Sequence, residues 1–356
     1  MTDARPVTLC IINFNGADRL DQVISAAGRS TLEFAEIAVV DDASTDGSIA
    51  LLRERHPRVR ILAQERNRGP GAARNAGYRA ASHDLILFID NDVALDPPCA
   101  AALRDALEAR VGALVAQPRV LYADRPDTVQ YDGADCHFLG LMALRHHGRL
   151  AADLPADTAE TRSMVTCAFM IDRGRWGEGE PFDTTFIFNL EDHDFGVRSR
   201  LAGHTLLSVP AATCLHGEGT PGLSFRAGGG VQTPTRVYCL IRNRWRIVLQ
   251  SYALRTLVLL APSLAAYEVF QLAGALRKGW MGPWVRAAWW LSTNPGVTWR
   301  RRRQVQASRR VSDRAVLVGG PLPFTSGLLG GGVERVARDW LERLTGAGWR
   351  RVQRFL

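Results

Sequence analysis

Two aspartates separated by one residue close an apolar run near position 90. Asp90 and Asp92 follow residues 85–89, an apolar run that predicts a fully buried strand. Alternation along an extended chain points both carboxylates to the same side. Like charges at the end of a buried strand are costly unless something pairs with them, and a divalent cation does so. Because hard oxygen ligands suit Mg²⁺ or Mn²⁺, the spacing predicts a metal site that phosphate oxygens complete.

The preceding segment shows the same arrangement at two more places. Apolar runs at 7–12 and 36–40 predict strands, and a further strand is expected at 59–62. Predicted helices at about 18–29, 44–55 and 72–82 separate these strands, a rhythm typical of a parallel sheet with helices on both faces. In such sheets ligands bind outside the carboxyl ends of the strands. Polar residues gather at those ends: Asn13, Asn15, Asp41 and Asp42, beside Asp90 and Asp92.

Residues 110–190 are less regular and predict mixed strands and loops. A second acidic group follows at 191–194 and begins a helix that is expected to end before Gly203, a good left-handed residue just past a helix end. His216 comes after a short predicted strand at 213–215. Its imidazole suits Mn²⁺, although a lone histidine is more often structural, and both interpretations stay open here.

Composition limits the class of protein. The chain has 356 residues, 46% of them hydrophobic and 22% charged, which is typical of one large domain with an appendage or of two domains. The net charge is +8, and Lys278 is the only lysine. Dense arginine blocks at 300–303 and 309–310 favour anionic lipid or nucleic acid. The six scattered cysteines and an N-terminus without an apolar core predict a cytosolic protein with reduced thiols and no signal peptide.

The character of the sequence changes at about residue 236. Residues 236–252 predict a helix, and residues 256–276 are mostly apolar but contain Pro262 and Glu268. The length allows a membrane span, but an acidic residue near its centre costs about 2.5–3.5 kcal/mol. We therefore expect an in-plane or re-entrant amphipathic segment at a membrane surface, with the following tryptophans at the interface. The alternative is a soluble helical subdomain with an aromatic core.

Taken together, the motifs resemble family 2 glycosyltransferases of the GT-A fold, rhamnosyltransferase-like, with a hydrophobic C-terminal tail. The resemblance covers about 1–225. It implies a Rossmann-like mixed α/β sheet in a catalytic domain at 1–235, with a nucleotide-sugar half to about 110 and an acceptor half after it. A helical, basic, membrane-associated region would occupy 236–356. The matching pieces are 7–15, 39–48, 67–69 with 73–77, 88–92, and 191–195 with Arg198 and Gly203.

The resemblance also implies roles on the donor side. Asp42 would read the nucleobase, with Asp41 serving the same pocket, and Arg74 would reach the pyrophosphate. Asp92 would be the direct metal ligand, and Asp90 would either support it or contact the ribose. Phe14 departs from the tyrosine usual in the family, which puts one hydrogen bond to base or ribose in doubt. The expected donor-binding residues are Ile12, Phe14, Asn15, Asp41, Asp42, Asn67, Gly69, Arg74, Asp90 and Asn91, and the expected metal ligands are Asp92, Asp90 and His216.

On the acceptor side, the resemblance makes Asp192 the general base and Glu191 the group that orients it or the acceptor. Asp194 is expected to interact with the helix dipole, and His193 to be local structure. The motif at 242–244 is expected to meet acceptor phosphate, lipid head groups or the catalytic domain. Residues 167–170 are bulkier than the glycine-rich stretch of many relatives, so the acceptor does not carry over.

The expected activity is therefore transfer of a sugar, with inversion, from a UDP-, dTDP- or GDP-linked donor with Mn²⁺ or Mg²⁺. The acceptor would be a hydroxyl of a polysaccharide, glycolipid or polyprenyl-linked glycan, at the inner face of the plasma membrane, with an anionic membrane surface and no nucleic acid as partner. The alternatives are a nucleotidyltransferase and a non-catalytic nucleotide-sugar binder. A nucleotidyltransferase would carry a basic, Gly-rich loop where residues 13–16 stand, and no dinucleotide fingerprint follows the first strand.

Overall fold

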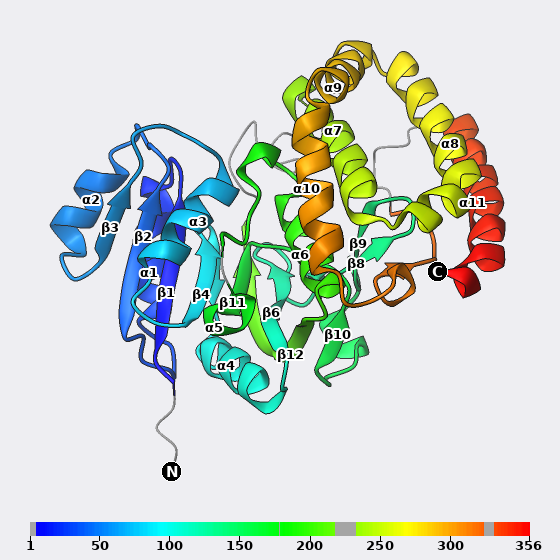
Figure 1. Ribbon diagram of the computed structural model, residues 1–356. Coiled ribbons are helices and arrows are strands. Elements are labelled where there is room, and N and C mark those ends of the chain that lie inside the picture. The colour runs from blue at the N-terminus through cyan, green and yellow to red at the C-terminus, as the bar shows by residue number, and fades with distance from the viewer. Residues whose placement is uncertain (1–4, 178, 218–232, 324–330) are drawn as a thin grey trace.

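The computed structural model describes residues 5–177, 179–217, 233–323 and 331–356. Within them ten strands form one mixed sheet and three form a second (Figure 1). The strands are β1 (Val7–Asn13), β2 (Glu36–Asp41), β3 (Arg60–Ala63), β4 (Leu85–Asp90), β5 (Val93–Leu95), β6 (Ala113–Tyr122), β7 (Val129–Tyr131), β8 (Ala134–His137), β9 (Leu141–Leu144), β10 (Ala159–Thr161), β11 (Ala168–Asp172), β12 (Thr205–His216) and β13 (Leu317–Val318).

Helices cover both faces of the large sheet and form a separate layer at the C-terminal end. They are α1 (Ala17–Ala27), α2 (Ser48–Arg55), α3 (Pro70–Ala80), α4 (Cys99–Ala109), α5 (Arg173–Trp176), α6 (Glu191–Leu201), α7 (Pro234–Ser251), α8 (Leu254–Arg277), α9 (Met281–Thr293), α10 (Pro295–Ser308) and α11 (Gly332–Val352). Short 3-10 turns lie at Ala151–Asp153, Thr184–Phe186, Asp313–Ala315 and Gln353–Phe355.

The first half is the predicted parallel sheet. β1 pairs in parallel with β2 and β4, and β2 pairs with β3. Alternate residues of β1 enter two cores, because successive side chains of a strand point to opposite faces. Leu9 and Ile11 pack with α1, α2 and α4, whereas Cys10 and Ile12 pack with α3 and α6. The α/β fold class expected from the sequence is confirmed.

The second half extends the sheet through antiparallel strands. The strand order is β10-β12-β6-β11-β4-β1-β2-β3, with β11 antiparallel to both β4 and β6. β6 has ten residues and all are buried, in the region where the sequence predicted mixed strands and loops without giving their bounds. Gln117, Pro118 and Arg119 interrupt its apolar pattern. Arg119 is buried because it pairs with Asp132 at 2.8 Å, a partner that the local sequence does not reveal.

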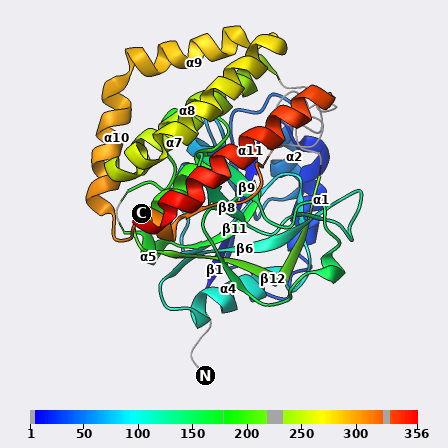
Figure 2. The same ribbon diagram turned by 90° about the vertical axis from the view of Figure 1, so that its right-hand side faces the viewer.

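The C-terminal helices pack on the second sheet, β13-β8-β9, and on each other (Figure 2). α8 is one continuous helix with Pro262 inside it, which rules out a re-entrant turn at 256–276. By length and composition it is the one helix among the described residues able to cross a membrane.

Part of the basic block contacts the protein itself: Arg301, Arg302 and Arg309 are half-buried, whereas Arg300, Arg303 and Arg310 are exposed. Arg302 donates to the carbonyl groups of Leu249 and Tyr252 at 2.5 and 2.8 Å, and Arg309 pairs with Asp313 at 2.6 Å. These arginines therefore tie α10 to the end of α7, because a guanidinium with several donors can satisfy several helix-end carbonyl groups at once.

Candidate active site

Three polar strand ends meet at one edge of the sheet, as the sequence predicted. The register places Asn13 beside Asp41 and Ile12 beside Asp90. Asp41 is fully buried and accepts hydrogen bonds from Asn13 Nδ2 at 2.7 Å and from the Ser44 amide at 2.8 Å. Asn91 Nδ2 donates to Asn13 Oδ1 at 2.8 Å. Asp41 and Asn91 thus both bond to the Asn13 side chain and so link the three strand ends. Their contacts with a donor stay a prediction.

Asp42 links the end of β2 to the start of α3. Its carboxylate accepts from the amides of Arg68 and Gly69 at 3.0 and 2.9 Å, and Asn67 Oδ1 also accepts from Gly69 at 3.1 Å. Burial raises the pKa of Asp42. Gly69 has φ of 86°, and a Cβ on it would lie 2.1 Å from the Ile187 carbonyl oxygen, so only glycine fits this loop.

On the other side of the same edge lie the remaining expected base-binding residues. Ile12 is buried, and Phe14 and Asn15 are half-buried after β1. Asn15 has φ of 50°, a left-handed conformation that asparagine tolerates better than most residues. Its side-chain oxygen accepts from the Thr45 amide at 2.9 Å, which holds the loops after β1 and β2 together.

Arg74 of α3 lies between the two acidic groups that the sequence singled out. Only 2% of this arginine is exposed. Its Nη2 donates to Asp90 Oδ1 at 2.6 Å and to the Thr166 carbonyl at 3.0 Å, and its Nη1 lies 3.7 Å from Glu191 Oε1. Nε and Nη1 have no hydrogen-bond acceptor among the described atoms. The guanidinium therefore joins the end of β4 to the start of α6.

The pKa values of the carboxyl groups around Arg74 are raised toward neutral pH. Burial raises the pKa of Asp90 to about 6, although the Arg74 charge opposes it. Burial and the negative charge of Asp192 raise the pKa of Glu191. Burial also raises the pKa of Asp192, against the hydrogen bond from the His193 amide and the charge of Arg74. Removing charge from water favours the neutral acid, and a nearby cation counteracts this.

Asp92 faces a different partner. Its Oδ1 lies 3.3 Å from Nε2 of His216, whose Nδ1 lies 2.5 Å from Gln130 Oε1. Burial alone would raise the pKa of Asp92, but the hydrogen bond and charge of His216 outweigh it, so the pKa is lowered and the carboxylate is ionised.

The pair formed by Asp92 and His216 fits a divalent metal. Adjacent ligands of an octahedral ion with bonds near 2.1 Å lie about 3 Å apart, close to the 3.3 Å that separates these two atoms. Within the described residues no group of three or more His, Cys, Asp and Glu is arranged to hold a metal. Because Asp90 is turned toward Arg74, the expected set of Asp90, Asp92 and His216 is not assembled by the protein alone.

α6 carries the acceptor-side acids in its first turn. Asp192 is half-buried, whereas His193 and Asp194 are fully buried. His193 lies 2.6 Å from Ser163 Oγ, and burial lowers its pKa to about 3, in keeping with a local structural role. Asp194 accepts from Arg198 at 2.7 Å and from Gln250 of α7 at 2.7 Å. Its role is therefore wider than a helix-dipole interaction, because it joins α6 to α7.

The loop before the acid pair is strained. Ile187, Asn189 and Leu190 have φ between 60° and 65°, which is rare for a β-branched residue such as isoleucine. Such conformations cost about 1–3 kcal/mol each and persist only where surrounding contacts hold them. This strain lies directly before Glu191, so the contacts that hold the loop also place the acids.

Those contacts come from α7, and a contact of the motif at 242–244 with the catalytic domain is one of the alternatives that the sequence left open. Asn243 Nδ2 donates to the carbonyl groups of Phe186, Phe188 and Asn189 at 3.1, 3.0 and 2.6 Å. Arg242 donates to Phe186 at 2.7 Å. The motif at 242–244 therefore contacts the catalytic half and not solvent. Arg242 and Asn243 are fully buried. Two polar residues side by side in an amphipathic helix were the sequence signal for this contact.

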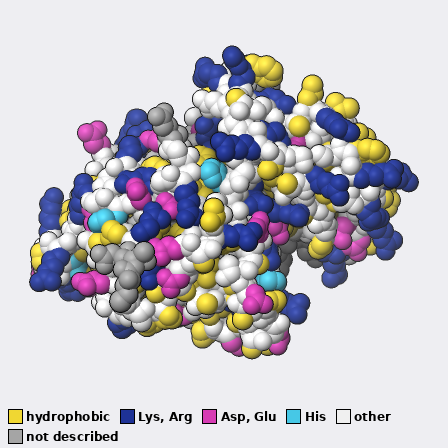
Figure 3. Space-filling model, turned by 60° about the horizontal axis from the view of Figure 1, so that its bottom comes forward, with side chains coloured by type: hydrophobic (Ala, Val, Ile, Leu, Met, Phe, Trp, Pro, Cys, Tyr) yellow, Lys and Arg dark blue, Asp and Glu magenta, His cyan; other side chains and the backbone are white. Residues whose placement is uncertain are grey.

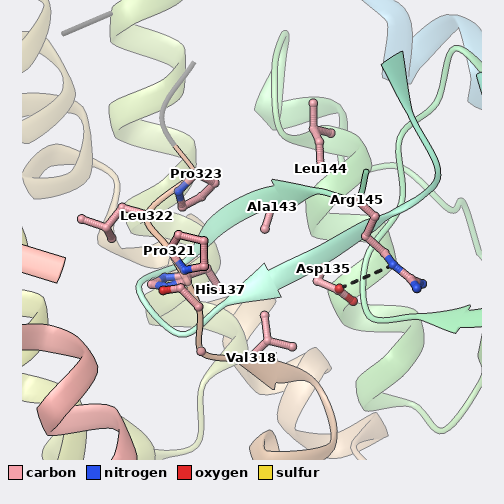
Figure 4. Close-up of a pocket in the computed structure, with 11 residues that line it drawn as sticks. Asp135, His137, Ala143, Leu144, Arg145, Val318, Pro321, Leu322 and Pro323 are labelled. Carbon is pink, nitrogen blue, oxygen red and sulfur yellow. Dashed lines mark hydrogen bonds and ion pairs between the residues drawn. The ribbon is translucent and has the colours of Figure 1, made fainter. Parts of the chain in front are cut away.

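A cavity of about 340 Å³ lies away from these acids (Figure 4). It is formed by the second sheet and the segment after β13, and Figure 4 shows Asp135 and Arg145 on one side and Pro321, Leu322 and Pro323 on the other. None of the expected site residues lines it.

Comparisons with known proteins bear on the family and the fold. Residues 8–173 match the family model described as Glycosyl transferase family 2. The succinoglycan biosynthesis proteins ExoO and ExoU of Rhizobium meliloti (strain 1021) are 40% and 37% identical over 128 and 97 residues, or 36% and 26% of this chain and 35% and 28% of theirs. The chain thus spans about a third of the length of these curated relatives.

A solved structure shares the fold. The crystal structure of GalNAc-T7 with UDP, GalNAc and Mn²⁺ superposes with a TM-score of 0.58 at 16% identity, over 77% of this chain and 52% of that chain. This similarity shows that the sheet and its flanking helices have the GT-A arrangement, and at this identity it shows the fold alone.

Replacing Arg74 tests the role of its charge. We expect Arg74→Ala to lower the free energy of unfolding at pH 8 by about 3–5 kcal/mol, as for other broken buried ion pairs. Without the cation, the folded-state pKa values of Asp90, Glu191 and Asp192, already raised by burial, rise further. As pH falls from 8 toward 5, protonation removes the buried negative charges that Arg74 otherwise neutralises. The difference in the free energy of unfolding between the variant and the unaltered protein therefore becomes smaller.

Urea unfolding at the two pH values measures this difference. Arg79→Ala is the matched control, since Arg79 lies on the same helix, pairs with Glu180 and is exposed, so it should cost less than about 1 kcal/mol. An equal loss at pH 8 and pH 5 for Arg74→Ala would contradict the charge-based account.

Replacing Asn243 tests the support of the strained loop. We expect Asn243→Ala to leave the carbonyl groups of Phe188 and Asn189 without their side-chain donor, while Arg242 still donates to Phe186, to cost about 1–3 kcal/mol and to speed amide hydrogen exchange at 186–190. Gln306→Ala is the control, because Gln306 donates in the same way to the carbonyl groups of Gln250 and Ser251. If both variants changed exchange at 186–190 alike, the loop would not depend on Asn243.

Proposed function

We propose that this family 2 glycosyltransferase, whose fold is GT-A, transfers one sugar with inversion from a nucleoside-diphosphate sugar to a hydroxyl group. The observation that carries the proposal is the contact of one buried arginine, Arg74, with both Asp90 and Glu191. This contact supports a single pocket in which the donor-side and acceptor-side acids face each other. Glu191 also serves Arg74 as a charge partner, whereas Asp192 has no such ion pair among the described residues, which favours catalysis over binding alone.

Asp192 is the base in this proposal. It takes the proton of the acceptor hydroxyl as that oxygen bonds to the anomeric carbon from the side opposite the leaving group. The bond from that carbon to the diphosphate oxygen breaks, and the nucleoside diphosphate leaves with the electron pair. A raised pKa brings Asp192 closer to the working pH, which strengthens it as a base while it remains ionised. Glu191, held near Arg74, orients the acceptor or Asp192.

Asp92 and His216 hold a divalent ion in this proposal, Mn²⁺ or Mg²⁺, with diphosphate oxygens as further ligands. When bound, such an ion neutralises the negative charge that develops on the leaving diphosphate. Gln130 lies next to His216 Nδ1 and so directs Nε2 toward Asp92. Asp90 contributes through Arg74, whose Nε and Nη1 have no hydrogen-bond acceptor among the described atoms and suit an anionic ligand.

The donor would lie along the strand ends described above. Asp42 at the end of β2 would accept from the base, and Ile12, Phe14 and Asn15 would line it. Asn67 and Gly69 shape the loop that closes this edge. The donor nucleotide is a uridine, thymidine or guanosine diphosphate. Since two relatives are succinoglycan biosynthesis proteins, we propose a growing glycan as the acceptor, either free or linked to a lipid.

We also place the protein at the inner surface of the plasma membrane. The proposal is supported by the apolar helix α8 and by the association of the relatives with polysaccharide biosynthesis. The surface that would make this attachment is treated in the next subsection.

Replacing the base should separate catalysis from binding. We expect Asp192→Asn to lower turnover of the donor by roughly 10²–10⁴-fold, the usual contribution of a general base, because an amide cannot take the proton. Nucleoside-diphosphate binding, measured by calorimetry, should be largely unchanged. Asp124→Asn, an exposed surface substitution, should leave both unchanged. Full activity in Asp192→Asn would remove the base assignment.

The metal ligands can be tested without turnover. We expect Asp92→Asn and His216→Ala each to weaken Mn²⁺ binding in the presence of nucleoside diphosphate by at least about tenfold. The electron paramagnetic resonance signal of free Mn²⁺ reports this binding directly. Asp192→Asn should bind Mn²⁺ like the unaltered protein, because Asp192 lies on α6, outside the proposed ligand pair. Unaltered binding in both ligand variants would exclude this pair as the metal site.

A further inference from the structure

The outward face of α8 is apolar along its whole length. Exposed residues recur at helical spacing, and none of them is charged between Arg255 and Arg277, which stand about 33 Å apart along the helix. Val258 and Val269 are 66% and 69% exposed, values rare for valine on a water-facing helix. The exposed residues are Leu254, Val258, Ala261, Pro262, Ala265, Val269, Ala273 and Leu276.

α11 lies beside α8 in the opposite direction and widens this face. Arg277 at the end of α8 pairs with Glu334 at the start of α11 at 3.0 Å, and Ser263 lies against Gly348. Figure 2 shows the two helices side by side on the face turned to the viewer. α11 adds an exposed stripe at every fourth residue, made of Val336, Trp340 and Leu344.

Positive charge borders the apolar stripe. All three acids of α11 are engaged: Glu334 with Arg277 and Lys278, Asp339 with Arg338, and Glu342 with the Leu322 amide. Figure 3 shows mainly dark-blue and yellow side chains next to each other on its right-hand side, where these helices lie. The exposed arginines of the two helices and the short turn after α11 are Arg255, Arg277, Arg335, Arg343, Arg350, Arg351 and Arg354.

The contacts on the inward side of α8 decide whether the helix crosses a bilayer or lies in its plane. Glu268 accepts from Arg244 Nη1 at 2.5 Å and from Trp245 Nε1 at 2.8 Å, both on α7. Leu260 and Tyr267 are buried in the core that α8 shares with α11. A helix that crossed a bilayer would have to leave these partners, and Arg244, which is 2% exposed, would lose the charge that pairs with it.

We propose that α8 and α11 together form a docking face, and that this face lies in the plane of an anionic phospholipid bilayer. The apolar stripe enters the acyl boundary, and the bordering arginines meet lipid phosphates, the combination by which amphipathic helices bind membranes. A second copy of the chain would bring the same arginines together, which the charge opposes. The proposal goes beyond the sugar transfer and does not depend on it.

Vesicle flotation of the full chain tests the docking face. We expect binding to vesicles of phosphatidylcholine with phosphatidylglycerol, little binding to phosphatidylcholine alone, and weaker binding at high salt. The double variant Val258→Asp with Val269→Asp should bind at least tenfold more weakly at an unchanged thermal midpoint. Val111→Asp is the matched control, because Val111 is 93% exposed on the loop between α4 and β6. It should float like the unaltered protein.

Alkaline carbonate should release the bound protein from vesicles, as expected for a helix that lies in the plane, whereas resistance to it would show a span and overturn the orientation. Unchanged flotation of the double variant would overturn the docking face. A concentration-dependent dimer that the same variant abolishes, with no vesicle binding, would also overturn it. Because no sugar donor is used, failure of the proposed activity would leave these outcomes unaffected.

Discussion

The buried guanidinium of Arg74 is the interaction on which the site depends. It contacts Asp90 at the end of β4 and Glu191 at the start of α6, two segments from opposite halves of the large sheet. Each partner needs the other: an arginine at 2% exposure is costly without carboxylates, and grouped carboxylates repel without a cation. The two halves of the candidate site are therefore joined by charge as well as by the sheet.

The acid pair also depends on a helix that lies outside the matched family region. The family match ends at residue 173, whereas Asn243 of α7 holds the strained loop that leads into Glu191. Gln250, on the same helix, bonds to Asp194. A chain cut at residue 235 would therefore lose the donors to the carbonyl groups of Phe188 and Asn189, in the loop whose left-handed conformations these contacts support.

The sequence predicted the polar strand ends at this edge of the sheet well because their signals are local. Apolar runs followed by acids, as at 85–92, describe a strand and its end within a few residues. The partners of buried polar residues are not local: Arg119 in β6 pairs with Asp132, and Asn243 reaches the loop before α6. In the same way, the arginine block at 300–303 favoured an anionic partner, and only the fold shows that Arg302 donates to the last carbonyl groups of α7.

Three consecutive residues of α7 connect the acids with the proposed docking face. Asn243 bonds the loop before Glu191, while Arg244 and Trp245 bond Glu268 on the inward side of α8. Successive residues of a helix point about 100° apart, so a single turn serves both neighbours. If α8 lies on a bilayer as proposed, this turn sets the distance of the acid pair from the lipid surface. An acceptor carried by a lipid would then meet Asp192 at a constant height, which a flexible anchor would not ensure.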